Sequence, residues 1–102
     1  SYVDLDEIVA NLYLGSWQSA VNLKALKLLN VTHILTMEES ELPDDVQRLF
    51  TCKFKHIVDS PYSNLLVHFD DCFQFIDEAI AQSTSILVHW YRLLFYILLD
   101  DC

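Results

Sequence analysis

Apolar and polar residues follow two different spacings along this chain, and the two spacings alternate. Short segments rich in β-branched and aromatic residues, continuous or alternating in apolar character, are typical of β-strands. Longer segments with apolar residues every three or four positions are typical of helices that pack on one side. Strands are predicted at residues 8–16, 31–37, 52–59 and 85–89, and helices at 16–29 and 64–82. This alternation predicts an α/β fold with a mostly parallel central sheet flanked by helices.

The clearest helix is predicted at residues 64–82. Its apolar residues recur at spacings of three and four, with acidic residues between them. One stripe is therefore expected to face the sheet, with Cys72 on or beside it as a core residue. The stripe consists of Leu66, Phe69, Phe73, Ile76 and Ile80.

Local signals mark the ends of several elements. Gly15 closes the first strand, and Asn30 is a plausible end of the first helix. Residues 85–89, "SILVH", form a continuous apolar run of the kind found in the middle of a parallel sheet. Residues 38–45, "EESELPDD", are expected to form an acidic loop. Such a charge run is usually a solvated surface, and the alternative is a contact with a basic partner.

Composition narrows the choice of partner. The chain has 102 residues, 53% of them hydrophobic, which fits one small domain, residues 1–102, with a core of its own. Its net charge of −9 repels nucleic acids and anionic membrane surfaces, so neither is an expected partner. A phosphate group would also be repelled unless a local basic site intervened.

The sequence offers few residues that could bind a metal, form a disulfide or take part in redox chemistry. The cysteines, Cys52, Cys72 and Cys102, show no paired spacing, which favours reduced thiols in a cytoplasmic or nuclear protein. His33, His56 and His68 lack metal-ligand spacing, so neither a metal nor another cofactor is expected. The longest apolar run, residues 93–99, is too short to span a bilayer. The chain begins at Ser1 rather than methionine, which favours a fragment.

Two stretches of the sequence resemble a known family. "NLYLGSWQSAVNLKALKLLNVTHIL" and "HFDDCFQFIDEAIAQSTSILVH" are similar to a dual-specificity protein phosphatase domain of the atypical or MAP-kinase-phosphatase kind. The resemblance covers residues 8–89 and stops abruptly, and residues 90–102 form a divergent tail. It therefore implies a single partial phosphatase-like domain that lacks the family's C-terminal helices.

The resemblance also identifies the positions at which the family's chemistry would be expected. Its enzymes remove phosphate from tyrosine, serine and threonine without a metal, using a loop of pattern H-C-x-x-G-x-x-R and an aspartate as general acid. His89 matches the loop histidine, but Trp90 stands at the nucleophile and Tyr96 at the arginine. Leu93 stands at the glycine, and Asp59 matches the general acid. Asp59 and His89 are expected to be structural remnants in this chain.

These substitutions predict that the chain is inactive in this form, and they leave its status as an enzyme open. An indole cannot attack phosphorus, a tyrosine cannot bind two phosphate oxygens as a guanidinium does, and leucine does not favour a phosphate-cradling loop. Three alternatives remain: a non-catalytic phosphatase-like protein that binds a phosphoprotein or a kinase, a truncated or alternatively spliced product without independent activity, or an active phosphatase whose loop lies outside this sequence. Loss of the covering helices also predicts self-association through an exposed sheet face.

Overall fold

The fold is seen in a computed structural model that describes residues 5–56 and 62–90, with side chains described for 5–56 and 70–89. Nine elements follow one another within these described residues. They are β1 (Leu5–Val9), β2 (Leu12–Gly15), α1 (Trp17–Ala20), α2 (Leu23–Leu28), β3 (Val31–Glu38), α3 (Asp44–Leu49), β4 (Thr51–His56), α4 (Tyr62–Ala81) and β5 (Ser85–Trp90).

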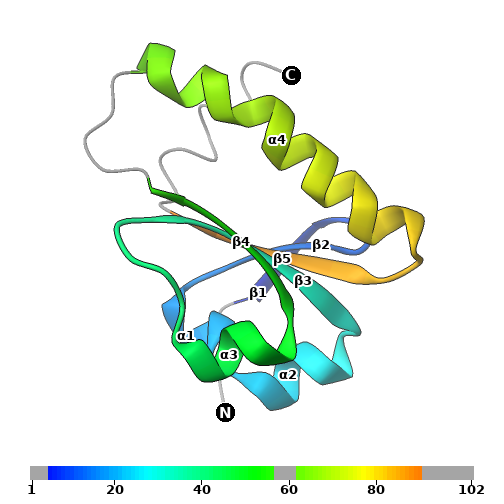
Figure 1. The fold of residues 1–102 in the computed structure, drawn as a ribbon. Coiled ribbons are helices and arrows are strands. Elements are labelled where there is room, and N and C mark those ends of the chain that lie inside the picture. The colour runs from blue at the N-terminus through cyan, green and yellow to red at the C-terminus, as the bar shows by residue number, and fades with distance from the viewer. Residues whose placement is uncertain (1–4, 57–61, 91–102) are drawn as a thin grey trace.

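The five strands form one sheet in the order β1-β2-β5-β3-β4. β2, β5, β3 and β4 are parallel to one another, and β1 pairs antiparallel with β2 at one edge. Figure 1 shows α4 across one face of the sheet and α1, α2 and α3 against the other. The predicted α/β class with a mostly parallel sheet flanked by helices is therefore confirmed.

Two elements predicted as continuous are each divided in two. The strand expected at residues 8–16 contains the end of β1, a turn and β2, and the two strands form a hairpin that turns at Asn11 in a left-handed conformation with φ of 70°. The helix expected at 16–29 breaks between α1 and α2 because the Asn22 side chain accepts a hydrogen bond from the Ala25 amide and starts a new helix. Asn30, with φ of 58°, ends α2 as predicted.

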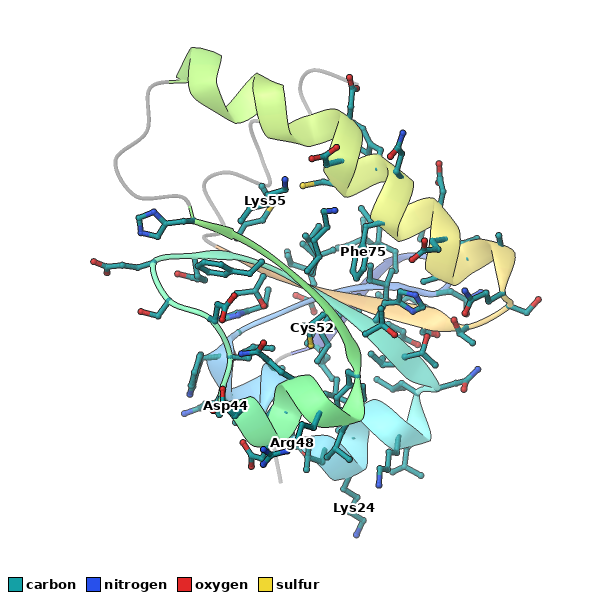
Figure 2. All side chains as sticks on the ribbon, viewed as in Figure 1. Lys24, Asp44, Arg48, Cys52, Lys55 and Phe75 are labelled. Carbon is teal, nitrogen blue, oxygen red and sulfur yellow. The ribbon has the colours of Figure 1, made fainter. Side chains whose placement is uncertain are left out.

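The core consists of two clusters, one on each face of the sheet. The cluster between the sheet and α4 contains Leu35, Met37, Cys72, Phe75, Ala79, Ile86 and Val88. The cluster between the sheet and α1, α2 and α3 contains Ala20, Leu26, Val31, Ile34, Leu42, Val46 and Leu87. Figure 2 shows Phe75 pointing from α4 toward the sheet, while Cys52 points to the opposite side.

The inward face of α4 differs from the predicted stripe. Phe73 and Ile80 are 40% and 38% exposed, whereas Phe75 and Ala79 are buried against the sheet. Ala79 permits close approach of the helix to the sheet, and the Phe75 ring packs edge-on against the His33 ring, 5.2 Å between centroids. The helix is therefore rotated relative to the sequence prediction, although Cys72 is buried as expected. The side chains of Leu66 and Phe69 lie outside the described part.

The expected exposed sheet face is not found at the central strands. In β3 and β5 the apolar side chains on both faces are at most 5% exposed, Ile34 and Leu87 on one side and Leu35 and Val88 on the other. Self-association through the sheet therefore stays a prediction that these two strands do not support. No helix within the described ranges is long and apolar enough to cross a membrane.

Candidate functional site

β5 brings two of the singled-out positions to the carboxyl edge of the sheet. It lies between β2 and β3, and the carboxyl ends of such parallel strands are where α/β folds usually bind ligands. Trp90 is the last residue of β5, and its backbone pairs with Met37 of β3. Asp59 and Tyr96 lie outside the described residues, so their assignment stays a prediction.

His89 is held between two neighbouring strands. It pairs in register with Gly15 of β2 on one side and Thr36 of β3 on the other, and its side chain is almost fully buried. Burial lowers the pKa of His89, so the imidazole is neutral at pH 7. Its Nε2 lies 3.7 Å from a Glu38 carboxylate oxygen, beyond hydrogen-bond distance, and within the described part its Nδ1 has no partner. The contact with Glu38 is therefore not a charged pair at neutral pH.

Gly15 makes room for this arrangement. A Cβ added there would lie 2.9 Å from the Ser19 Cβ and 2.9 Å from the ends of the Leu5 and Leu87 side chains. The strand before α1 can pass this close to the helix only because glycine has no side chain. The same close passage places Trp17, the first residue of α1, beside His89, with ring centroids 5.9 Å apart.

An open hollow lies beside His89 at this edge. It has a volume of about 240 Å³ and is lined by Trp17 of α1, His89 of β5, and Glu38, Glu39 and Ser40 at the end of β3 and just beyond it. We call this the edge hollow. Burial raises the pKa of Glu38, a hydrogen bond from the Glu39 backbone amide acts to lower it, and repulsion from the Glu39 carboxylate acts to raise it. The hollow is therefore acidic, and it disfavours a phosphate group.

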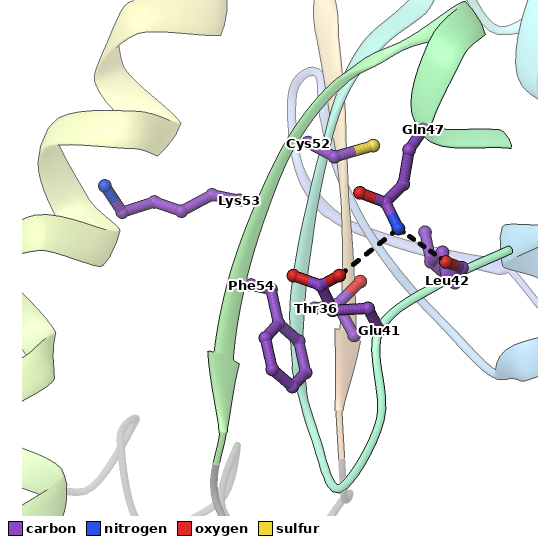
Figure 3. A pocket seen from close by; sticks show the side chains of 7 residues that line it. All are labelled: Thr36, Glu41, Leu42, Gln47, Cys52, Lys53 and Phe54. Carbon is purple, nitrogen blue, oxygen red and sulfur yellow. Dashed lines mark hydrogen bonds between the residues drawn. The ribbon is translucent and has the colours of Figure 1, made fainter. Parts of the chain in front are cut away.

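A second, smaller cavity lies on the same side of the sheet, under α3 (Figure 3). Its volume is about 40 Å³, which is large enough for water but not for a substrate. The Gln47 side chain closes it by donating to the Leu42 carbonyl at 2.7 Å and to Glu41 at 3.4 Å. Lys53 points away from this cavity toward α4, where its ammonium lies 5.9 Å from the Phe75 ring centroid. This cavity is a packing feature of the α3 side.

The described cysteines are not activated nucleophiles. Burial raises the pKa of the Cys72 thiol to about 11, although Lys55 and Lys53 act to lower it. Burial also raises the pKa of Cys52, and the Glu41 carboxylate adds to this effect. A thiol needs a lowered pKa to attack at neutral pH, so neither of these two thiols is activated as a nucleophile. The prediction that Cys72 belongs to the core is confirmed.

The three histidines whose side chains are described, His33, His56 and His89, do not form a metal-binding group. His33 Nδ1 lies 2.7 Å from the Thr32 hydroxyl, and its Nε2 lies 3.5 Å from the Glu78 carboxylate. His56 is exposed at the end of β4, and the His68 side chain is outside the described set. Among the side chains of residues 5–56 and 70–89, no group of three histidine, cysteine, aspartate or glutamate residues is placed to hold a metal ion.

Of the five residues that line the edge hollow, only His89 was singled out from the sequence. Trp17 lies in the segment 11–35 that resembles the family but belongs to no motif of its own, and Glu38 was assigned to a solvated acidic loop. Only the strand order brings Trp17 and Glu38 to the same site. Trp17 begins α1, which follows β2, and Glu38 ends β3, and both of these strands lie next to β5. Sequence spacing alone does not reveal which strands are neighbours.

Comparison with known proteins agrees with the fold and the earlier resemblance. No family model matches the chain. Dual specificity protein phosphatase 1 of Arabidopsis thaliana is 46% identical over 87 residues, covering 82% of this chain and 42% of that protein. Dual specificity protein phosphatase MPK-4 of Drosophila melanogaster is 35% identical over 91 residues, covering 87% of this chain and 24% of that protein. The chain thus spans less than half the length of these two relatives.

Solved structures show the same architecture. The crystal structure of DUSP15 matches with a TM-score of 0.76 and 27% identity, covering 88% of this chain and 56% of that one. The human tyrosine phosphatase-like serine/threonine/tyrosine-interacting protein matches with a TM-score of 0.76 and 27% identity, covering 87% of this chain and 63% of that one. Both likenesses extend over most of the present chain and only part of the other.

Proposed function

Because the chain belongs to the dual-specificity phosphatase family, we propose that in this form it is a phosphatase-fold protein that binds a partner without catalysing phosphate removal. The observation that carries this proposal is the position of Trp90. It ends the central strand β5, directly after His89, where the family's pattern requires the nucleophilic cysteine. An indole N–H can donate a hydrogen bond but cannot form the covalent phospho-enzyme bond.

The surroundings of β5 support the loss of chemistry. A catalytic phosphate site needs positive potential, from backbone amides, a helix N-terminus or a guanidinium. The edge hollow presents instead the carboxylates of Glu38 and Glu39 beside a neutral His89. The thiols of Cys52 and Cys72 stay protonated at neutral pH, so neither of these two described cysteines takes the place of the nucleophile.

A binding role fits the retained scaffold. Both faces of the central strands are covered, which favours a chain that folds and presents a defined surface. One structural neighbour is itself named as phosphatase-like and as an interacting protein. By resemblance, the partner is a phosphoprotein or a kinase, recognised without turnover.

The activity test uses the 102-residue chain with p-nitrophenyl phosphate and a phosphotyrosine peptide. Phosphate release should equal that of buffer, and Trp90→Cys should remain equally inactive because Leu93 and Tyr96 still replace the loop glycine and arginine. Turnover that scales with the wild-type chain, and that survives repurification, would overturn the proposal.

A fold test separates binding from a product without independent activity. A two-dimensional amide NMR spectrum of the same chain should show dispersed, countable peaks if the scaffold is stably formed. Collapsed or broadened peaks would favour the alternative of a truncated product and would remove the basis for a binding role.

A further inference from the structure

The edge hollow has an unbalanced charge. Glu38 and Glu39 are consecutive carboxylates at its rim, and neither forms an ion pair with a lysine or arginine anywhere in residues 5–56 or 70–89. Figure 2 shows the labelled Lys24 and Arg48 on the helices of one side and Lys55 near α4. Of these, Lys55 is engaged with Asp71 at 2.9 Å. The negative potential at the hollow is therefore not neutralised by the cations of the described part.

The uncharged walls of the hollow suit a flat cation. Trp17 is 46% exposed, an unusually open position for so large an aromatic ring, and its indole stands beside the imidazole of His89. Aromatic faces attract guanidinium and ammonium groups. His89 is 97% buried, since its exposure is 3%, and its Nδ1 has no hydrogen-bond partner among the described residues. A buried polar atom without a partner costs free energy, so the His89 wall of the hollow carries an unsatisfied polar group.

We propose that the edge hollow binds an arginine side chain from a basic segment of a protein partner. This inference rests on the proposed non-catalytic binding function and names the chemistry of the partner. The guanidinium stacks on Trp17 and donates to the Glu38 carboxylate, with Glu39 adding charge at the rim. Arginine suits this site better than lysine because it is planar, binds a carboxylate through two parallel hydrogen bonds, and loses less hydration on stacking.

The charge of the edge hollow is opposite to that of a phosphate-binding site, which would be positive. A phosphorylated side chain would be repelled at short range by the two carboxylates of the hollow. It would also be repelled at longer range by the net charge of −9 on the chain. A basic segment would be steered toward the same surface. Recognition of a phosphoprotein would then depend on its basic residues rather than on its phosphate group.

The test measures binding of a fluorescein-labelled peptide with four arginines spaced by glycine and serine. Fluorescence anisotropy is followed as the 102-residue chain is added at low ionic strength. Two matched peptides replace arginine by citrulline, which keeps shape and removes charge, or by lysine, which keeps charge and removes planarity. The arginine peptide should bind tightest, the lysine peptide about three- to tenfold more weakly, and the citrulline peptide should not bind measurably.

Variants locate the site. Glu38→Gln should weaken binding about tenfold, as expected for loss of a charge-assisted hydrogen bond, and Trp17→Leu about two- to fivefold. Asp77→Asn is the matched control, because it removes the same charge from the exposed side of α4, distant in sequence from the hollow. It should change affinity less than twofold. Chemical shifts of the Trp17 indole N–H should move on addition of the peptide in the wild-type chain and in Asp77→Asn.

Several outcomes would overturn the inference. Equal weakening by Glu38→Gln and Asp77→Asn would mean general charge attraction rather than a site. Equal affinity for the citrulline and arginine peptides would mean that binding does not depend on the positive charge of the guanidinium group. No binding to the wild-type chain, with binding restored by Arg92→Gln, would mean that the chain's own Arg92, which lies outside the described residues, occupies the hollow. Each of these results leaves the proposed loss of catalysis standing, whereas phosphate release in the activity assay would overturn that proposal whatever the peptide does.

Discussion

Thr36 and His89 are register partners on β3 and β5, and each carries one buried polar atom without a hydrogen-bond partner among the described residues. The two atoms are the Thr36 hydroxyl and His89 Nδ1. Both residues lie on the α1 to α3 side of the two central strands, in a sheet otherwise lined there by aliphatic side chains. Unpaired buried polar groups cost free energy. These two groups therefore destabilise the fold locally, near the carboxyl ends of the central strands, where a ligand site would be expected.

The first prediction concerns the Thr36 hydroxyl. Thr36→Val keeps the branched shape and removes a group that was desolvated without a partner, so the free energy of unfolding should stay equal or rise by about 1 kcal/mol. Thr84→Val is the matched control, because the Thr84 hydroxyl donates to the Ala79 carbonyl at 2.9 Å and accepts from Thr32 at 2.8 Å. That variant should lose about 1–2 kcal/mol. Urea unfolding measures both, and a larger loss at Thr36 than at Thr84 would contradict the prediction.

The second prediction concerns pH and His89. Burial lowers the folded-state pKa of His89 below the ordinary value of 6.5, so on acidification the unfolded chain takes up this proton first. The stability that depends on neutral His89 is complete above pH 6.5, and it is lost progressively as the pH falls from 6.5 toward the folded-state pKa. Urea unfolding of wild-type chain and His89→Gln at several pH values should show a steeper acid loss for the wild type.

Glu38 acts with the opposite sign in this experiment. Its folded-state pKa is raised, so its ionisation destabilises the fold at higher pH and its protonation relieves this as the pH falls. Because both chains retain Glu38, the difference between them reports His89 together with its 3.7 Å contact with Glu38. Parallel pH profiles for the two chains would show that His89 is not the group responsible.

The third prediction concerns Gly15. Gly15→Ala should lower the free energy of unfolding by about 1–3 kcal/mol, because the added methyl group overlaps Leu5, Leu87 and the Ser19 Cβ. The two leucine ends can move, but the Ser19 Cβ is attached to the backbone of α1. Leu5→Ala removes one of the overlapping groups, so the double variant should lose less than the sum of the single losses. Strict additivity in urea unfolding would argue against overlap as the cause.

The fourth prediction concerns the Cys72 thiol at alkaline pH. The folded-state pKa is raised to about 11 against an ordinary 9.0, so between these values the unfolded chain releases the thiol proton and the folded chain keeps it. Stability should therefore fall as the pH rises through this range, by as much as about 3 kcal/mol from this group. Cys72→Ala should show a shallower alkaline loss than the wild type, measured by urea unfolding from pH 8 to pH 11. An unchanged slope would mean that the thiol is not shielded from solvent.

The order of the six predicted elements follows from the sequence because it depends on local spacing. The apolar run at residues 85–89 became the central strand β5, and Asn30 ended α2 where its tolerance for a left-handed conformation allowed it. The α/β class likewise follows from strands alternating with helices. Cys72 was predicted to be buried because it lies on the inner side of a strongly periodic helix.

The rotation of α4 was decided by tertiary packing. The periodic pattern allows either of two adjacent stripes to face inward, and the sheet accepts the one with Ala79 and Phe75 because they fit closely against β3 and β5. Phe73 and Ile80, which the pattern placed inside, are left partly exposed. The break at Asn22 was decided in the same way by a competing side-chain hydrogen bond.

The sequence by itself predicts that Trp90 stands at the family's nucleophile position, because this prediction depends only on alignment with a local pattern. The edge hollow was decided by the tertiary structure, since Trp17, Glu38 and His89 lie far apart along the chain and meet only when β2, β5 and β3 become neighbours. Burial then sets their chemistry, keeping His89 neutral and leaving the carboxylates without a cation in the described part. The sequence fixes the identity of each residue. Strand order, which brings distant residues together, and desolvation, which shifts their pKa values, arise only in the folded molecule.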